Sequence, residues 1–454
     1  MVIIMKNKRT LQHMLSLVLV AVLMAAIFAG CGSKQTPAAE AEIKQEEVKK
    51  ERREVTGAIM QSRYCSGLEQ MIQKLEEEEN IYLDMQVVPD DQYNNMLKMQ
   101  LNSGIAPDLL DFNCPHIYGF LGNPENYMED LSAEPWAERL LSKDLFSYEG
   151  KVYALPFYNI QGLQCIIYNK DALEKAGVEK LPTTKEEFNA VCEQIKAAGI
   201  IPLLMPADSW CSQIWMSSGF AQVMGSVEAA EEFADQLFTN QAKLTDHPEL
   251  AAVIDDFVGN VTAGYVNDDF LTVPHTECIQ RLATGEAAMY YHNGVAITNK
   301  ILSDYPNANI GLMIYPADFN PQGLLSVSAY SASFFVNKDG EHVETAKEVL
   351  RLFSTPEYCN LYYTDGNGGF PALEGVSGGE IHDVIYNFYT EKLEAGKLVS
   401  EMNIHFIPVE SLESGTLWTY YQEAAQGKMT GAEVLERFQV DIEKYMKEQK
   451  APGF

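Results

Sequence analysis

Basic side chains are scarce in this sequence. Lys and Arg number 33 against 64 Asp and Glu residues, which gives a formal net charge of −31. A field of that sign repels nucleic-acid phosphates and anionic lipid headgroups. We therefore expect no nucleic-acid partner and no binding to anionic lipids through basic residues. We interpret the excess of acidic residues mainly as a solvated surface.

Cysteine and histidine are few and show no ligand spacing. The eight cysteines contain no CxxC pair, and setting Cys31 aside leaves an odd number, so a disulfide framework is not indicated. We expect most of them to be buried small hydrophobes. The eight histidines form no HxxxH or HExxH motif. The sequence predicts no metal site, no cofactor and no catalytic residues.

The chain has ample material for sizeable cores. It has 454 residues, of which 46% are hydrophobic and 10% aromatic. Those values exclude a disordered chain, a collagen and a small disulfide scaffold. The length favours two or three domains.

The N-terminal residues have the composition of an export signal. Residues 1–30 have a basic start without acids, and the run Leu15–Ala29 contains only Ser16 as a polar residue. A run of about 15 apolar residues indicates a secretory signal rather than a membrane span. The small residues before Cys31 resemble a bacterial lipobox, which implies acylation of Cys31; a plain signal peptide with an incidental cysteine is the alternative. Residues 31–54 are polar and are interpreted as a flexible linker.

Strand and helix patterns alternate after the linker. The spacing predicts strands and helices in turn at Val55–Gln61, Leu68–Glu79, Ile81–Val88, Asp91–Ser103 and Pro107–Phe112. This order predicts parallel βα units. Further strands are expected at Lys151–Pro156, Gln164–Tyr168, Ile310–Tyr315, Ser326–Tyr330 and Ser333–Val336, and helices at Asp171–Ala176 and Thr184–Ala198. Residues 210–300, and those after Val343, are predicted to be mostly helical.

Five segments in order resemble the extracellular solute-binding proteins of bacterial sugar ABC transporters. They are Ser103–Leu110 (SGIAPDLL), Tyr148–Pro156 (YEGKVYALP), Ile167–Phe188 with its YNKD, AG and LPTTKEEF pieces, Thr284–Met289 (TGEAAM) and Asn309–Pro316. Each segment is weak alone and has ordinary structural uses, but the set covers about residues 55–446.

The resemblance implies an α/β, two-lobed periplasmic-binding-protein-like fold of type II, with a ligand cleft between the lobes. We expect lobe 1 at 55–160 and 311–355 and lobe 2 at 161–310 and 356–454. The chain is expected to cross between lobes near Phe157–Gln164, Ile310–Ala317 and Phe353–Tyr358. Such a protein would be a non-catalytic monomer that captures a carbohydrate, is tethered to the cell membrane only by its lipid, and delivers its ligand to the permease of an ABC transporter.

Aromatic and polar residues at strand exits are the candidate ligand contacts. Sugar-binding sites use aromatic rings that stack on the apolar faces of the sugar, and amides or carboxylates that form hydrogen bonds with its hydroxyls. By the resemblance, Phe112 and Trp418 correspond to aromatics that stack on sugar in maltose-type binders. The remaining candidates follow strands or lie in polar loops: Arg63, Tyr64, Asp111, Asn113, Tyr158, Trp210, Asn293 and Tyr330.

Two other functions remain open. The same fold could hold a non-sugar solute, and an anionic one would need Arg63, the one candidate arginine. A surface glycosidase would instead need two carboxylates about 5–10 Å apart. With 64 acidic residues some pair will meet that distance, so proximity alone is uninformative.

Overall fold

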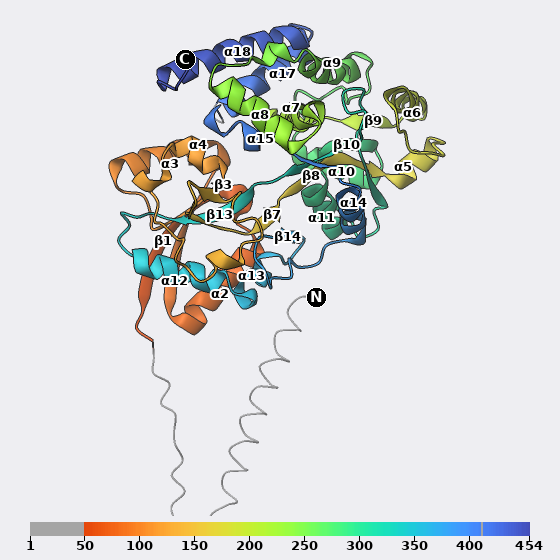
Figure 1. Ribbon diagram of the computed structural model, residues 1–454. Coiled ribbons are helices and arrows are strands. Elements are labelled where there is room, and N and C mark those ends of the chain that lie inside the picture. The colour runs from red at the N-terminus through yellow and green to blue at the C-terminus, as the bar shows by residue number, and fades with distance from the viewer. Residues whose placement is uncertain (1–49, 410–411) are drawn as a thin grey trace, which may run out of the picture. The chain divides into compact units, whose positions relative to one another are not determined.

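The computed structural model describes residues 50–409 and 412–454, and Lys50–Phe454 form one compact unit. The predicted signal, Cys31 and most of the predicted linker lie outside the described residues. Within the described part of the chain, no helix combines the length and apolar character needed to cross a bilayer. Two β-sheets, each with helices on both faces, organise the unit (Figure 1).

The first sheet has five strands in the order β2-β1-β3-β13-β6. β1 is parallel to β2 and β3, whereas β13 runs antiparallel to β3 and β6. The parallel βα units predicted from the sequence are therefore confirmed. The strands are β1 (Arg53–Met60), β2 (Ile81–Val88), β3 (Leu109–Cys114), β6 (Ala154–Pro156) and β13 (Ser331–Val336).

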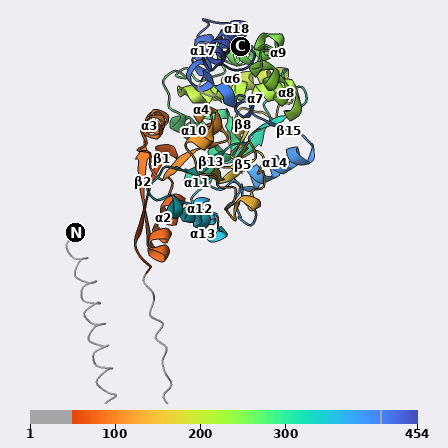
Figure 2. The ribbon, with the colours of Figure 1, turned by 60° about the vertical axis from the view of Figure 1, so that its left-hand side comes forward.

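Two apolar layers cover the faces of this sheet. Val55 and Ile59 of β1 pack into one layer, and Ala58 packs into the other, because successive side chains of a strand point to opposite faces. Figures 1 and 2 show α12 and α13 on the same side as α2. The covering helices are α2 (Ser66–Glu79), α12 (Val343–Phe353) and α13 (Pro356–Tyr362) on the first face, and α3 (Asp90–Ser103) and α4 (His116–Leu121) on the second.

The second sheet has six strands and is built around β8. Its order is β15-β12-β8-β10-β9, with β11 also paired to β8. β10 and β12 each run antiparallel to β8. On their outer sides, β10 pairs in parallel with β9, and β12 pairs in parallel with β15. The strands are β8 (Gly162–Asn169), β9 (Ile201–Leu204), β10 (Ala287–Asn293), β11 (Ile310–Met313), β12 (Leu325–Ser328) and β15 (Leu398–Ser400).

Helices again bury both faces of the second sheet. On one face they form a large helical layer (Figure 1). One face is covered by α10 (His275–Thr284), α11 (Gly294–Asp304) and α14 (Asp383–Glu394). The other face carries α5 (Lys170–Lys175), α6 (Lys185–Ala197), α7 (Ser209–Met224), α8 (Val227–Phe238), α9 (Glu249–Thr262), α15 (Met402–His405), α17 (Trp418–Ala425) and α18 (Gly431–Glu448).

Local signals set many of the element ends. Gly104 ends α3 with φ of 66°, a left-handed conformation that glycine adopts without a Cβ penalty. The Thr184 side chain accepts a hydrogen bond from the Glu187 amide and caps α6. The strand β10 was missed within a region predicted to be mostly helical. It is buried from Ala287 to His292, so it lacks the polar alternation that marks a half-exposed strand.

Within residues 50–409 and 412–454, the chain crosses between the two sheets at three places. The first joins β6 to β8 through β7 (Tyr158–Ile160), as predicted, and the second is Ala329–Tyr330 between β12 and β13. The third lies between α13, in a core of the first sheet, and α14, in a core of the second, and contains β14 (Phe370–Pro371).

These positions correct part of the expected lobe division. The expected crossing at Ile310–Ala317 is wrong, because β11 and β12 both pair with β8 and so belong to the second sheet rather than to lobe 1. The crossing expected at Phe353–Tyr358 lies further along the chain, because α12 and α13 share one core. Below, lobe 1 and lobe 2 mean the first and second sheets with the helices packed on them.

Candidate functional site

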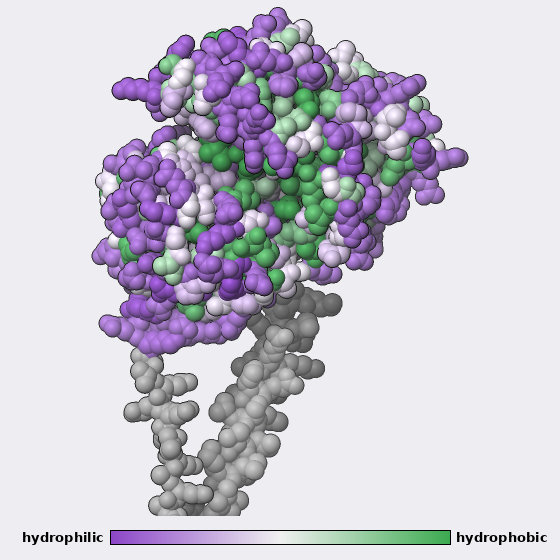
Figure 3. All heavy atoms as spheres, in the orientation of Figure 1, coloured by the Kyte–Doolittle hydropathy of each residue, from purple (hydrophilic) through white to green (hydrophobic). Residues whose placement is uncertain are grey.

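Strand ends from both sheets meet at a cavity between the lobes. β1 ends at Met60, just before Arg63, whereas β10 ends at Asn293 in the opposite lobe. A cavity of about 550 Å³ lies there, lined by Ser62, Arg63 and Tyr158 from the lobe 1 side and by Gln161, Asn293 and Ala296 from the lobe 2 side, among others. Ligands of open α/β sheets bind at such carboxyl edges. Figure 3 shows hydrophobic residues gathered along a hollow between the two lobes.

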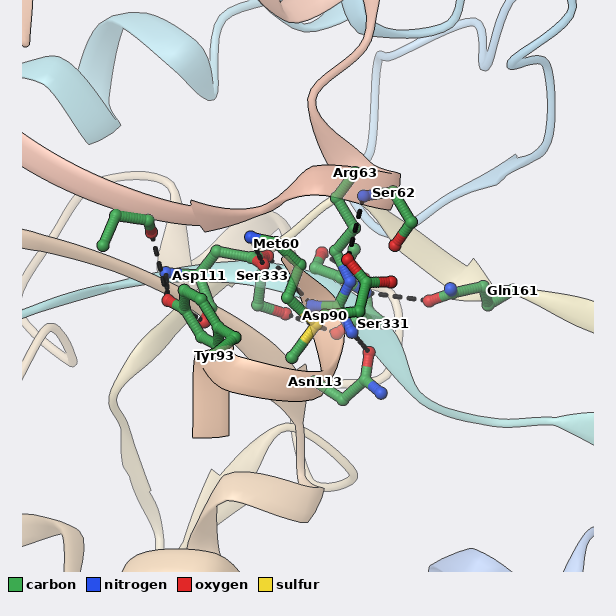
Figure 4. Close-up of polar contacts among 12 residues, drawn as sticks. Met60, Ser62, Arg63, Asp90, Tyr93, Asp111, Asn113, Gln161, Ser331 and Ser333 are labelled. Carbon is green, nitrogen blue, oxygen red and sulfur yellow. Dashed lines mark hydrogen bonds and ion pairs between the residues drawn. The ribbon is translucent and has the colours of Figure 1, made fainter. Parts of the chain in front are cut away.

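Arg63 is held in place by two side chains of β3. Its guanidinium donates to Asp111 Oδ1 at 2.9 Å and to Asn113 Oδ1 at 2.7 Å (Figure 4). Asp111 and Asn113 are two residues apart on one strand and therefore point to the same face. The Met60 amide also donates to Asp111, at 3.3 Å. β1 and β3 thus present one preformed polar cluster at the edge of lobe 1.

The charges of this cluster compensate each other. Asp111 is only 3% exposed, so burial raises the pKa of its carboxyl group, and the neighbouring Arg63 opposes that rise. Burial is the largest single influence on Arg63 and works against its charge, but the charge and the hydrogen bond of Asp111, with smaller contributions from Tyr362 and Tyr93, together raise the pKa of the guanidinium. Lys300, a second cation lining the cavity, pairs with Asp304 at 2.7 Å. Both cations are therefore bound to carboxylates.

Asn293 shapes the lobe 2 wall of the cavity. Its side-chain oxygen accepts from the amides of Val295 and Ala296 and caps α11. Its amide nitrogen approaches the Gln161 carbonyl at 3.4 Å. A Cβ on Gly162 would lie 2.4 Å from Asn293 Nδ2, so glycine at this position makes room for the amide. The small side chains of Val295 and Ala296 leave space beside it in the cavity.

Tyr158 is an aromatic residue of the cavity lining where the chain first crosses between the lobes. Its hydroxyl donates to the Asn367 carbonyl at 2.9 Å. The ring packs against Tyr362 and Tyr363 in edge-on geometry. Tyr158 lines the cavity with Arg63 and Asn293. Together with Asp111 and Asn113, which hold Arg63, five of the ten predicted ligand contacts lie at or directly behind this cavity.

The other predicted contacts lie elsewhere or outside the described side chains. Phe112 is 3% exposed and stacks on Phe120 in the lobe 1 core, since it alternates with Asp111 and Asn113. Tyr64 packs on the opposite core of the same lobe. The Tyr330 ring packs against the His116 ring in a tilted arrangement at the second crossing. Trp418 begins α17 and packs on the large lobe 2 core. Trp210 lies in the first turn of α7, and its side chain is not among those described.

A buried carboxyl group in lobe 2 was missed from the sequence. Glu401 follows β15 and is 1% exposed. Its Oε2 accepts from Gln164 Nε2 at 2.9 Å and from the Ser328 hydroxyl at 3.2 Å. Burial raises the pKa of Glu401 to about 7, and these hydrogen bonds oppose the rise. The sequence offered no signal, because the partners come from strands far apart in the chain.

A second group missed from the sequence combines a thiol with two imidazoles. Cys211, His275 and His292 each place one potential ligand atom within 4.8 Å of the other two. Cys211 Sγ lies 3.8 Å from His275 Nδ1. Burial lowers the pKa of His275 to about 4 and that of His292 well below its usual value. The seven described cysteines are free thiols.

One family model matches more than half of the chain. A family model described as bacterial extracellular solute-binding protein matches residues 64–358. A melibiose/raffinose/stachyose-binding protein of Bacillus subtilis is 22% identical over 274 residues, covering 59% of this chain and 62% of that protein. A putative binding protein of Brucella abortus is 31% identical over 135 residues, covering 28% and 32% respectively. The chain thus spans less than two thirds of the length of these curated relatives.

Solved structures share the fold over most of the chain. A chitin oligosaccharide binding protein has a TM-score of 0.74 at 20% identity and covers 87% of this chain and 99% of its own. RafE in complex with raffinose has a TM-score of 0.69 at 20% identity and covers 86% and 99%. These likenesses confirm the predicted two-lobed α/β fold of type II.

Proposed function

Because the chain belongs to the family of bacterial extracellular solute-binding proteins, we propose that it captures a carbohydrate outside the cell and delivers it to an ABC permease. Binding proteins for melibiose, raffinose, stachyose and chitin oligosaccharides are among its relatives and structural neighbours. These likenesses favour an oligosaccharide ligand. Family members are transport proteins, so the proposal includes no catalytic step.

The charge balance of the cavity is the observation that carries the ligand class. An anionic solute needs a cation that is not already neutralised, but Arg63 is paired with Asp111 and Lys300 with Asp304. Apart from the Asp365 carboxylate, which accepts from the Ser66 hydroxyl at 2.6 Å, uncharged groups remain around the cavity, including Gln161, Asn293 and Asn299, beside the ring of Tyr158. Amide groups and an aromatic face suit the hydroxyls and apolar faces of a sugar.

The remaining contacts belong to the same proposal. Trp210 and Trp418 would add stacking faces from lobe 2, and Tyr330 would contribute from the second crossing. Phe112 and Tyr64 would contribute from lobe 1 only if lobe closure turned them out of the cores against which they pack. Closure of the lobes about the three crossings would bury the ligand. Acylation of Cys31 would hold the mature protein at the outer face of the membrane, where a monomer could present its closed form to the permease.

A thermal-shift panel tests the proposed ligand class. Full-length chain in mild detergent is mixed with raffinose, stachyose and chitin oligosaccharides, and separately with amino acids, polyamines and phosphonates. A ligand at 100 times its Kd stabilises the native state by about 2.7 kcal/mol. We expect the melting temperature to rise with at least one neutral oligosaccharide, which chromatography should recover unchanged.

Two results would overturn this assignment. A shift confined to charged solutes would support the same fold with another cargo. Hydrolysis of the added oligosaccharide would support a carbohydrate-active enzyme. Isothermal titration of any stabilising sugar against the wild type and an Asn293→Ala variant then tests whether the cavity between the lobes is the binding site.

A further inference from the structure

Three side chains of lobe 2 that are distant in sequence converge at one point. Cys211 lies in the first turn of α7, His275 is the first residue of α10, and His292 is near the end of β10. One thiol sulfur and one nitrogen from each ring lie within 4.8 Å of one another. The two imidazole centroids are 5.0 Å apart. Thiolate and imidazole together are the ligands that zinc and similar transition metals prefer.

Hydrogen bonds to Asp208 fix two of the three donors, Cys211 and His275, relative to each other. Asp208 accepts a 2.7 Å hydrogen bond from the His275 amide, and its carbonyl accepts from the Cys211 amide at 2.9 Å. The start of α7 is thereby joined to the start of α10. The Tyr290 hydroxyl lies 2.8 Å from His275 Nδ1, the same nitrogen that approaches the Cys211 sulfur, so an ion at this nitrogen replaces that contact.

We propose that Cys211, His275 and His292 form a binding site for a zinc-class divalent cation in lobe 2. The site is distinct from the cavity between the lobes, although His292 directly precedes Asn293 in β10. It does not depend on the carbohydrate function.

The observed spacing requires only a small contraction to accept the ion. Zinc–sulfur and zinc–nitrogen bonds of about 2.3 and 2.0–2.1 Å at tetrahedral angles place ligand atoms roughly 3.3–3.6 Å apart. The sulfur and His275 Nδ1 are already 3.8 Å apart, and the limiting separation in the trio is 4.8 Å. Side-chain rotations that bring the ligand atoms about 1.2 Å closer together would reach the zinc-bound separation.

The three donors differ in burial. Cys211 and His292 are buried, whereas His275 is half-buried. Asp208, also half-buried, holds its carboxylate against the His275 amide. Three protein ligands leave one tetrahedral position for water or another small donor.

Cobalt and zinc titrations test the proposal on the full-length chain in mild detergent. Metal-stripped protein is titrated with CoCl₂, and we expect one ion per chain, with visible bands of tetrahedral cobalt and a near-ultraviolet band from sulfur to cobalt. Zinc should displace the cobalt. X-ray absorption of the zinc-loaded protein should show one sulfur neighbour and the remainder nitrogen or oxygen.

Variants locate the ion. Cys211→Ser should abolish the sulfur band, and Cys211→Ser and His275→Gln should each weaken zinc binding more than the roughly 10–100-fold caused by loss of an outer partner. Cys192→Ser, which removes another buried thiol, is the matched control and should bind as the wild type does. Zinc binding unchanged by Cys211→Ser, or a zinc shell without sulfur, would overturn the proposal. The absorption measurement needs no variant and decides the case even if a substitution prevents folding.

Discussion

Each lobe buries a carboxyl group near the edge of its sheet that faces the other lobe, but the two are compensated differently. Asp111 in lobe 1 is paired with the guanidinium of Arg63. Glu401 in lobe 2 is held by neutral donors from Gln164 and Ser328. A buried charge that loses its ion-pair partner is strongly destabilising, whereas a carboxyl group among neutral donors can become protonated instead. The stability of lobe 1 should therefore depend on an intact pair of Arg63 and Asp111, and the stability of lobe 2 should depend on the pH.

The largest effect is expected from breaking the pair in lobe 1. Arg63→Met leaves Asp111 buried without its cation and should lower the free energy of unfolding by about 3–5 kcal/mol. Urea denaturation measures the loss. Replacing Asp111 by Asn in the same chain should recover much of it, because the uncompensated charge is removed.

A second buried pair serves as the control for this comparison. Lys185 and Asp256 are 2.8 Å apart in lobe 2, with similarly low exposure. Lys185→Met should also destabilise the protein but should leave affinity for an oligosaccharide unchanged, whereas Arg63→Met should reduce it. If Arg63→Met lowered the free energy of unfolding by less than about 1 kcal/mol, the pair would contribute no more than a solvent-exposed ion pair does.

The next effect concerns the pH dependence of lobe 2. The native pKa of Glu401 is about 7, above its ordinary value of 4.5, so the folded state holds this proton more tightly than the unfolded state does. Stability is therefore greatest below the unfolded pKa and falls as the pH rises through 7. The difference amounts to about 3 kcal/mol.

Glu401→Gln removes this titration. Between pH 5 and 8 the wild type should lose about 3 kcal/mol relative to the variant, as followed by denaturant unfolding at several pH values. Parallel pH profiles of the two proteins would contradict a buried titrating carboxyl group at this position.

The smallest effect separates capping from ligand contact. Asn293→Ala removes the cap of α11 and should cost about 1 kcal/mol of stability. Thr184→Ala removes the cap of α6, away from the cavity, and should cost a similar amount. Only the Asn293 variant should weaken oligosaccharide binding in isothermal titration. Equal affinities in both variants would remove Asn293 from the binding site.

Local patterns predicted many elements because their signals are contained in a few consecutive residues. Ile81–Val88 was predicted with the bounds that β2 has, and the helix predicted at Thr184–Ala198 starts at the residue that caps α6. β10 was missed because a strand buried on both faces shows no alternation. The crossing at Ala329–Tyr330 was missed because strand pairing with β8, not local sequence, assigns β11 and β12 to lobe 2.

The residues of the candidate site also divide into those that local sequence rules predicted and those that they did not. Arg63, Asp111 and Asn113 were identified because strand exits gather at one edge of a sheet, a rule that applies within short βα units. Phe112 was predicted to stack on a ligand, but the alternation that directs Asp111 and Asn113 to the cluster directs Phe112 into the core; its predicted contact stays a proposal. Glu401 and the Cys211 group gave no signal in the sequence.

The order of residues alone determined the acidic surface, the family motifs, and the helix and strand signals that lie within a few positions of one another. Tertiary structure decided which buried polar groups became partners, because Arg63 meets Asp111 across 48 positions and Gln164 meets Glu401 across 237. Burial then fixed their chemistry: the desolvation of a charge depends on what the folded chain packs around it, and no local pattern contains that information.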